Sequence, residues 1–106
     1  MKIIWSDFAS ETLGGIYKYY KEALSKNVAH KIKSSIFSAT EQLIKHPDSG
    51  QIEKSLEQLK EGHRYLVKDN YKIVYKQVKE RILITDVFDT RQDPIKMNDK
   101  KRKPSR

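Results

Sequence analysis

The chain has 106 residues, no cysteine and a formal net charge of +8. This length allows one domain with a single modest core. The lack of cysteine excludes disulfides, thiolate metal sites and a cysteine nucleophile. No run of about 18 apolar residues is present, so we expect a cytoplasmic protein without a membrane span.

The first quarter of the chain is predicted to form a strand followed by a helix. The apolar run Lys2–Trp5 suits a strand, and either Ser6 or Asp7 can cap a helix that starts just after it. Apolar residues then recur at spacings of three and four over residues 8–24. The pair Gly14-Gly15 interrupts this stripe, which predicts close packing or a bend there.

A second helix is predicted over residues 27–45, with Asn27 as its cap. Only a few residues separate it from the first, so the two helices should lie antiparallel as a hairpin. Pro47 ends the second helix because the residue before a proline is pushed out of helical geometry. Residues 51–61 carry three apolar residues at helical spacing, which predicts two or three further helical turns.

The second half of the chain contains three strand-like segments, at residues 63–68, 71–78 and 81–88. The short connections between them predict an antiparallel meander. The last segment is almost continuously apolar, which favours an interior position in the sheet. The predicted class is therefore α+β in the order βααβββ, with a two-helix hairpin packed on one face of a small antiparallel sheet.

The register of the first strand pair decides which side chains share a face. A three-residue loop at residues 68–70, with Asn70 in the left-handed conformation, pairs Val67 with Tyr71 and collects the apolar residues on one side. The predicted helix-facing side chains are His63, Tyr65, Val67, Tyr71, Ile73 and Tyr75. The predicted outward-facing side chains are Arg64, Leu66, Lys72, Val74 and Lys76.

This register predicts one cationic face formed by Arg64, Lys72 and Lys76. Exposed lysines on a sheet often only increase solubility, and that alternative stays open. Leu66 and Val74 lie between the cations, however, and an interleaved apolar surface is more typical of a contact surface. We therefore predict Arg64, Lys72 and Lys76, with Arg91 just past the last strand, as target contacts.

Few residues suggest catalysis. His30, His46 and His63 are too widely spaced for a metal site, and no phosphate-binding glycine loop is present, so we expect no metal and no cofactor. His63 has an ordinary pKa near neutrality and is the candidate general acid or base. Asp86 interrupts the apolar last strand, either as a paired structural acid or at a bulge that re-aims Arg91.

Residues 96–106 form a basic tail, with six of the 22 cations and only one of the 14 acids. The tail has almost no apolar residues to bury, so we expect it to be disordered and to attract polyanions or an acidic partner.

The ordered set of these segments resembles the RelE/ParE superfamily of toxins from type II toxin–antitoxin modules. The resemblance rests on IIWSDFASETLGGIYKYY, LIKHPDSG and HRYLVKDNYKIVYKQVKERILITDVFDTRQDP, and it covers roughly residues 2–94. It implies a toxin domain over residues 1–95 with the βααβββ fold and a cognate antitoxin as partner. No membrane or small-molecule ligand is expected.

The superfamily includes two kinds of activity. RelE-like toxins are ribosome-dependent messenger-RNA endonucleases, whereas ParE-like toxins inhibit DNA gyrase and are not nucleases. For the nuclease, Arg64 and Lys72 match positions where RelE-like enzymes have cations, and Arg91 lies near a further basic position. With His63 they are the catalytic candidates of a metal-independent endoribonuclease.

Two departures from the nuclease pattern favour the ParE-like activity. Leu66 stands where a second lysine is wanted, and Asp89 stands where a basic or histidine residue often sits. An acid in a site for RNA phosphates adds repulsion where attraction is needed. Gyrase inhibition is therefore the favoured function, messenger-RNA cleavage is the alternative, and enzymatic activity is left open.

Overall fold

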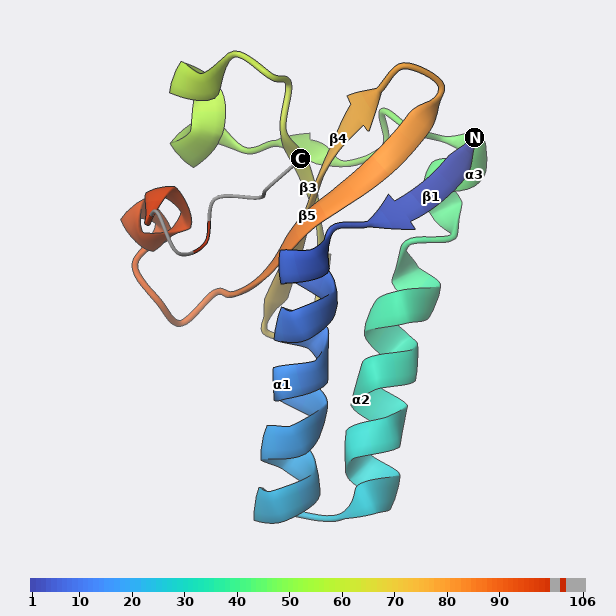
Figure 1. The fold of residues 1–106 in the computed structure, drawn as a ribbon, viewed down its shortest axis with the longest axis vertical. Helices are drawn as coiled ribbons and strands as arrows, with labels where there is room; N and C mark the ends of the chain where they lie inside the picture. The colour runs from blue at the N-terminus through green and yellow to red at the C-terminus, as the bar shows by residue number, and fades with distance from the viewer. Residues whose placement is uncertain (100–101, 103–106) are drawn as a thin grey trace.

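The computed structural model describes the placement of residues 1–99 and 102. A five-stranded sheet packs against a hairpin of two helices, which confirms the predicted α+β class (Figure 1). The elements are β1 (Lys2–Trp5), α1 (Asp7–Ala23), α2 (Lys26–Ala39), α3 (Gln42–Lys45), β2 (Gln51–Ile52), the 3₁₀ helix η1 (Lys54–Leu59), β3 (Arg64–Lys68), β4 (Tyr71–Val78), β5 (Arg81–Asp89) and the 3₁₀ helix η2 (Pro94–Asn98). None of the helices in the described part of the chain is long and apolar enough to cross a membrane.

The strands lie in the order β1-β5-β4-β3-β2. The strands β3 to β5 pair antiparallel as predicted. The unpredicted β2 pairs antiparallel to β3, whereas β1 pairs parallel to β5. The sheet is therefore mostly rather than wholly antiparallel. The nearly continuous apolar strand β5 lies between β1 and β4, as its composition predicts.

The first helix follows its sequence pattern closely. Ser6 caps it, since its Oγ accepts a hydrogen bond of 3.0 Å from the backbone N–H of Ala9. The two glycines at positions 14 and 15 differ from expectation, because a Cβ built at either would meet no atom within 4 Å. Close packing within the described fold therefore does not explain them.

The predicted second helix is divided in two. Its cap is Ser25 rather than Asn27, and the Oγ of Ser25 accepts a hydrogen bond from the N–H of Val28. The helix ends at Ala39. The hydroxyl of Thr40 donates a hydrogen bond of 2.7 Å to the carbonyl of Phe37, and the backbone N–H groups of Thr40 and Glu41 bond to carbonyls three residues back, as in a 3₁₀ turn. The remaining turn forms the short α3.

Two short 3₁₀ helices cover the face of the sheet that α1 and α2 leave open. Residues 51–61, predicted as a few turns of α-helix, form the two-residue strand β2 and then η1. The start of the predicted disordered tail is ordered as part of η2, where Met97 is buried. Residues 100–101 and 103–106 of that tail lie outside the described residues.

The first hairpin has a different register from the predicted one. Lys68 pairs with Tyr71 across a two-residue turn, and Asp69 rather than Asn70 adopts the left-handed conformation, with φ of 53°. Paired residues share a face, so the side chains of β3 are reversed relative to the prediction. The parity of β4 is as predicted, with Tyr71, Ile73 and Tyr75 in the core against the helices.

The predicted register was wrong because it assumed that only one face of the sheet is apolar. Leu66 lies in the helix-facing core, and Tyr65 packs with a second cluster on the opposite face. Between Ile84 and Asp86 a bulge leaves Thr85 without a partner on β4, which turns Val87 toward the helices. The second cluster consists of Leu56, Val74, Phe88 and Met97, with Leu59 and Tyr65 packed against it.

Candidate functional site

The four predicted target contacts do not share a surface. Arg64 pairs with Tyr75, which lies in the helix-facing core, so its side chain is on that face. Lys72 and Lys76 alternate with the core residues along β4 and therefore point to the opposite face. Arg91 lies past the end of β5, beside α1. The prediction of one continuous cationic face is therefore wrong, and the cause is the one-residue change of register in β3.

Arg64 holds a loop against the sheet. One of its guanidinium nitrogens donates a hydrogen bond of 2.8 Å to the carbonyl of Gly50. The hydroxyl of Tyr75 accepts from the N–H of Gly50 and donates to the carbonyl of Pro47 at 2.7 Å. A Cβ at position 50 would come within 2.8 Å of the Tyr65 carbonyl, so only glycine allows this approach. These contacts give Arg64 a structural role.

The two lysines of the opposite face are paired with acids from the segment that covers them. The ammonium group of Lys72 lies 3.0 Å from a carboxylate oxygen of Glu53, which is almost fully buried, and 4.2 Å from the ring centre of Tyr65. The ammonium group of Lys76 lies 2.6 Å from Glu61. These positive charges are compensated inside the protein.

His63, the candidate acid or base, is buried beside these ion pairs. Its side chain is 1% exposed, and neither ring nitrogen has a hydrogen-bond partner among the described residues. Burial, and then the charge of Lys76, lower the pKa of His63 below its usual value of 6.5. The ring is therefore neutral near pH 7 and is not accessible to a substrate.

Asp86 is a paired structural acid, and its partner comes from the predicted tail. Arg102 donates a 2.7 Å hydrogen bond to the carboxylate, and its guanidinium lies 5.2 Å from the ring centre of Phe8 and 5.1 Å from that of Phe88. Burial raises the pKa of Asp86, and the charge of Arg102 opposes that rise. An acid inside an apolar strand indicates that a cation pairs with it. No sequence pattern, however, showed that this cation is Arg102 in the tail.

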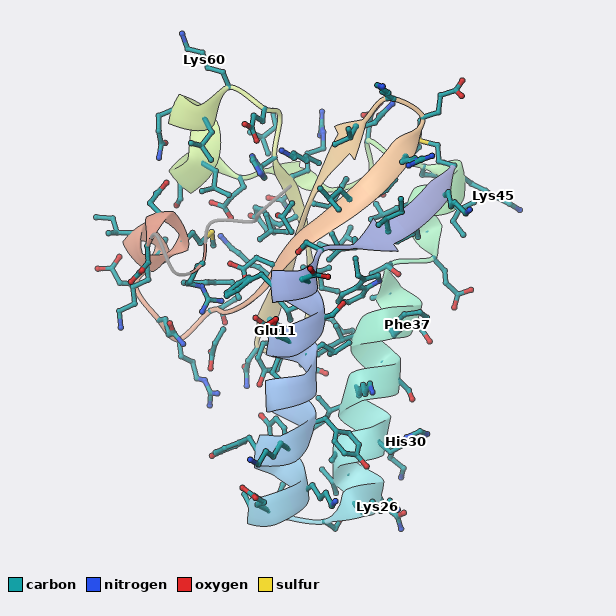
Figure 2. All side chains as sticks on the ribbon, in the orientation of Figure 1. Glu11, Lys26, His30, Phe37, Lys45 and Lys60 are labelled. Atoms are coloured by element: carbon teal, nitrogen blue, oxygen red, sulfur yellow. The ribbon has the colours of Figure 1, made fainter. Side chains whose placement is uncertain are left out.

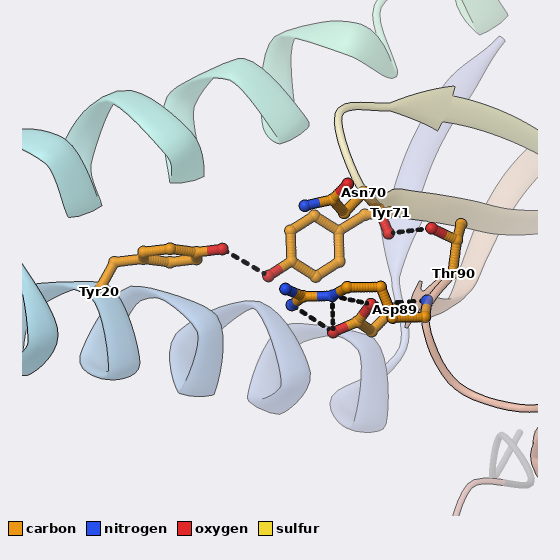
Figure 3. A network of polar contacts seen from close by, with 6 residues as sticks. Tyr20, Asn70, Tyr71, Asp89 and Thr90 are labelled. Atoms are coloured by element: carbon orange, nitrogen blue, oxygen red, sulfur yellow. Dashed lines mark hydrogen bonds and ion pairs between the residues drawn. The ribbon is translucent and has the colours of Figure 1, made fainter.

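Arg91 remains as the exposed cation of the four, with 62% of its side chain accessible. Its guanidinium makes a two-point contact with Asp89, with Nη2 at 2.7 Å from one carboxylate oxygen and Nε at 3.0 Å from the other (Figure 3). This contact lowers the pKa of Asp89 and raises the pKa of Arg91. The acid that seemed out of place in the sequence therefore orients the arginine.

Arg91 borders a groove of about 500 Å³, named here the Arg91 groove. Side chains of α1 form one wall, and the end of β5 with the residues after it forms the other. The lining residues are Thr12, Gly15, Ile16, Tyr19, Tyr71, Val87, Asp89, Arg91, Gln92 and Arg102. Apart from Arg91, no sequence pattern pointed to this surface, although the exposed Tyr19 and the unexplained Gly15 both belong to it.

Tyr71, one of the lining residues of the groove, is bonded to a tyrosine from a distant part of the chain. The hydroxyl of Tyr71 on β4 donates to that of Tyr20 on α1, at 3.4 Å (Figure 3). Burial, and then this hydrogen bond, raise the pKa of Tyr71. The phenol of Tyr71 therefore remains protonated near neutral pH, and its hydrogen bond to Tyr20 connects the strand to the helix.

The composition of the Arg91 groove is that of a candidate contact surface. Among residues 1–99 and 102, no three histidine, aspartate or glutamate side chains come together to hold a metal ion. The Arg91 groove combines an exposed arginine and an exposed tyrosine, which are residue types enriched at the energetic centres of protein interfaces. The fold and this site define a small α+β protein with a groove beside the first helix of its hairpin.

Comparison with known proteins gives the family. The family model described as the ParE toxin of type II toxin–antitoxin system, parDE, matches residues 3–94. The chain belongs to this ParE toxin family, as its sequence resemblance indicated. No curated protein matches the chain.

A solved structure has the same fold. It is the chromosomal ParDE toxin–antitoxin system from P. aeruginosa, and one of its chains superposes with a TM-score of 0.73 at 17% sequence identity. The alignment covers 84% of this protein and 95% of that chain.

Proposed function

We propose that this ParE-family toxin inhibits DNA gyrase in the cytoplasm and that a cognate antitoxin neutralises it. The family assignment over residues 3–94 carries the proposal. In the superfamily that the sequence resembles, ParE-like toxins act on gyrase, whereas RelE-like toxins cut messenger RNA.

The contacts of the candidate catalytic residues support this choice over the nuclease. Metal-independent RNA cleavage needs cations directed at one phosphodiester and a general base within reach of it. Arg64 and Lys72 point to different faces of the sheet, and His63 is buried. Lys72 is also paired with a buried acid. None of these groups is positioned to act together with Arg91 on one substrate.

We assign the target contact to the Arg91 groove. The guanidinium of Arg91 is exposed but already oriented by Asp89, so it loses little side-chain freedom when it binds. Tyr19 on α1 is 62% exposed at the same groove and offers an aromatic surface. Arg64, Lys72 and Lys76 then serve the fold and not the target.

Inhibition of purified gyrase tests the proposal. The wild-type protein should block DNA supercoiling, and Arg91→Gln should need about 10-fold more toxin or higher for half-inhibition, because an anchoring arginine is lost. Arg81→Gln is the matched control, since Arg81 is also exposed but lies at the other end of β5. Unimpaired supercoiling together with codon-linked cleavage of messenger RNA on ribosomes would select the nuclease instead.

A further inference from the structure

The first helix contains two glycines that its own packing does not require. Gly14 and Gly15 lie in the middle of α1, and both are exposed. Neither has a positive φ, and a Cβ built at either would meet no atom within 4 Å. Alanine would therefore fit at both positions, and it favours a helix interior more than glycine does. The reason for a glycine here must lie outside the contacts of the described fold.

The two glycines lie on different sides of the helix. Consecutive residues of an α-helix are turned by about 100° from each other, whereas residues three and four apart share a face. The face of α1 that lines the Arg91 groove consists of Thr12, Gly15, Ile16 and Tyr19. Gly14 is not one of the lining residues, so a contact in the groove would involve Gly15 but not its neighbour.

The groove side of α1 is not covered by the second helix. In Figure 2, α1 lies between α2, which carries the labelled His30 and Phe37, and the segment that follows β5. On the α2 side, the ammonium group of Lys33 lies 5.4 Å from the ring centre of Tyr17. On the other side is the Arg91 groove, where Gly15 is exposed. A partner can therefore reach Gly15 directly from solvent.

Gly15 forms a gap in the wall of the groove. On the lining face of α1, Thr12 lies one turn before it and Tyr19 one turn after it. No atom of the described fold enters the space where its side chain would be. Glycine is the usual residue where a backbone must approach a ligand closely. The gap between two side chains is therefore suited to the main chain of a partner.

The other wall of the groove has free hydrogen-bond donors. The Nε and Nη2 atoms of Arg91 bond to Asp89, whereas Nη1 makes no hydrogen bond to any residue in the described part of the chain. Guanidinium N–H groups donate to oxygen atoms, and most strongly to a carboxylate. Gln92, which also lines the groove, has an amide that can both donate and accept. This wall is complementary to a peptide segment that carries an acidic side chain.

We propose that Gly15 admits the main chain of a peptide segment of the target, and that an acidic side chain of this segment binds the free Nη1 of Arg91. The inference rests on the proposed function, which assigns the target contact to the Arg91 groove. Any side chain at position 15 would hold the target away from the helix. Gly15 is thus a specificity-determining residue, and its benefit is in binding although it weakens the helix.

The test compares the same substitution at two neighbouring positions of the full-length toxin. Gly15→Ala and Gly14→Ala should each raise the thermal midpoint by about 4–8 °C, because each replaces an open glycine inside a helix. Gly15→Ala should need about 5-fold more toxin or higher for half-inhibition of purified gyrase, since one added methyl group in a close contact separates the two surfaces. Gly14→Ala should inhibit like the wild type.

A longer side chain sharpens the comparison. Gly15→Gln should raise the half-inhibition concentration by about 30-fold or more, whereas Gly14→Gln should leave it unchanged. A toxin that is more stable but less active is a result that a purely structural role of Gly15 does not give. Wild-type inhibition by both folded Gly15 variants overturns the proposal. Equal losses at positions 14 and 15 also overturn it, because they show that the two glycines act through the helix backbone.

Growth arrest on expression of the toxin alone separates this inference from the choice of target. If the wild type arrests growth but leaves gyrase active, the target assignment is wrong, and the same four variants scored by growth arrest still decide the role of Gly15. A wild-type protein that neither inhibits gyrase nor arrests growth contradicts both proposals. Full activity of the Gly15 variants in both assays contradicts the role of Gly15 alone.

Discussion

The two faces of the sheet are stabilised in different ways. The face toward α1 and α2 is an apolar core in which Ile73, Ile82 and Ile84 are fully buried. The opposite face is covered by η1 and η2 and has a smaller apolar cluster. Beside this cluster lie three ion pairs, Lys72–Glu53, Lys76–Glu61 and Arg102–Asp86.

This difference shows why a cation in a strand is not by itself a sign of a charged partner. In this domain the two long helices cover one face of the sheet, and the cover of the second face consists of short segments with few apolar residues. Buried acids and bases in such a cover must be paired, because an unpaired buried charge is costly. The lysines of β4 therefore neutralise acids of the same chain.

The largest expected effect is a cavity in the helix-facing core. Ile84→Ala should lower the free energy of unfolding by about 2–5 kcal/mol, because the surrounding side chains cannot collapse into the space. Urea denaturation followed by circular dichroism measures this change. Ile95→Ala, at a residue that is 74% exposed, is the control and should leave the midpoint unchanged. Equal midpoints for the two variants would remove the distinction between core and surface.

The next effect tests the ion pairs of the opposite face. Arg102→Met leaves the carboxylate of Asp86 buried without its cation and should cost about 2–3 kcal/mol, less than a fully buried pair because the arginine is 21% exposed. Burial then holds the folded-state pKa of Asp86 above its unfolded value, so the stability of the variant should rise as the pH falls toward that pKa. The double variant Asp86→Asn/Arg102→Met should recover most of the loss. Absence of recovery would show that Arg102 acts through packing on Phe8 and Phe88.

The smallest effect is the pH dependence contributed by His63. Burial lowers its folded-state pKa, so the unfolded chain takes up a proton first as the pH falls below about 6.5. Stability should therefore decrease as the pH falls below about 6.5 toward the folded-state pKa, and His63→Phe should reduce that decrease. His30→Phe, at an exposed position on α2, should not change it. The measurement is the thermal midpoint of each protein at several pH values.

Local sequence patterns predicted the elements better than their pairing. The strand β1, the Ser6 cap, the α1 stripe and the parity of β4 follow from spacing and capping, which involve neighbouring residues only. The division of the predicted second helix at Thr40 depends on one hydroxyl that donates a hydrogen bond to the backbone. The apolar spacing is helical on both sides of Thr40, so the sequence pattern did not show this division. For the candidate site, only Arg91 was found in an exposed position where a partner can reach it.

The sequence by itself determined the α+β class, the family and the excess of positive charge. The tertiary structure alone decided which cations are available. The register of β3 depends on a second apolar face, and that face exists only because η1 and η2 fold over it from distant positions. The same long-range contacts pair Lys72, Lys76 and Arg102 with acids, leave Arg91 exposed, and bring it together with Gly15 and Tyr19 around one groove.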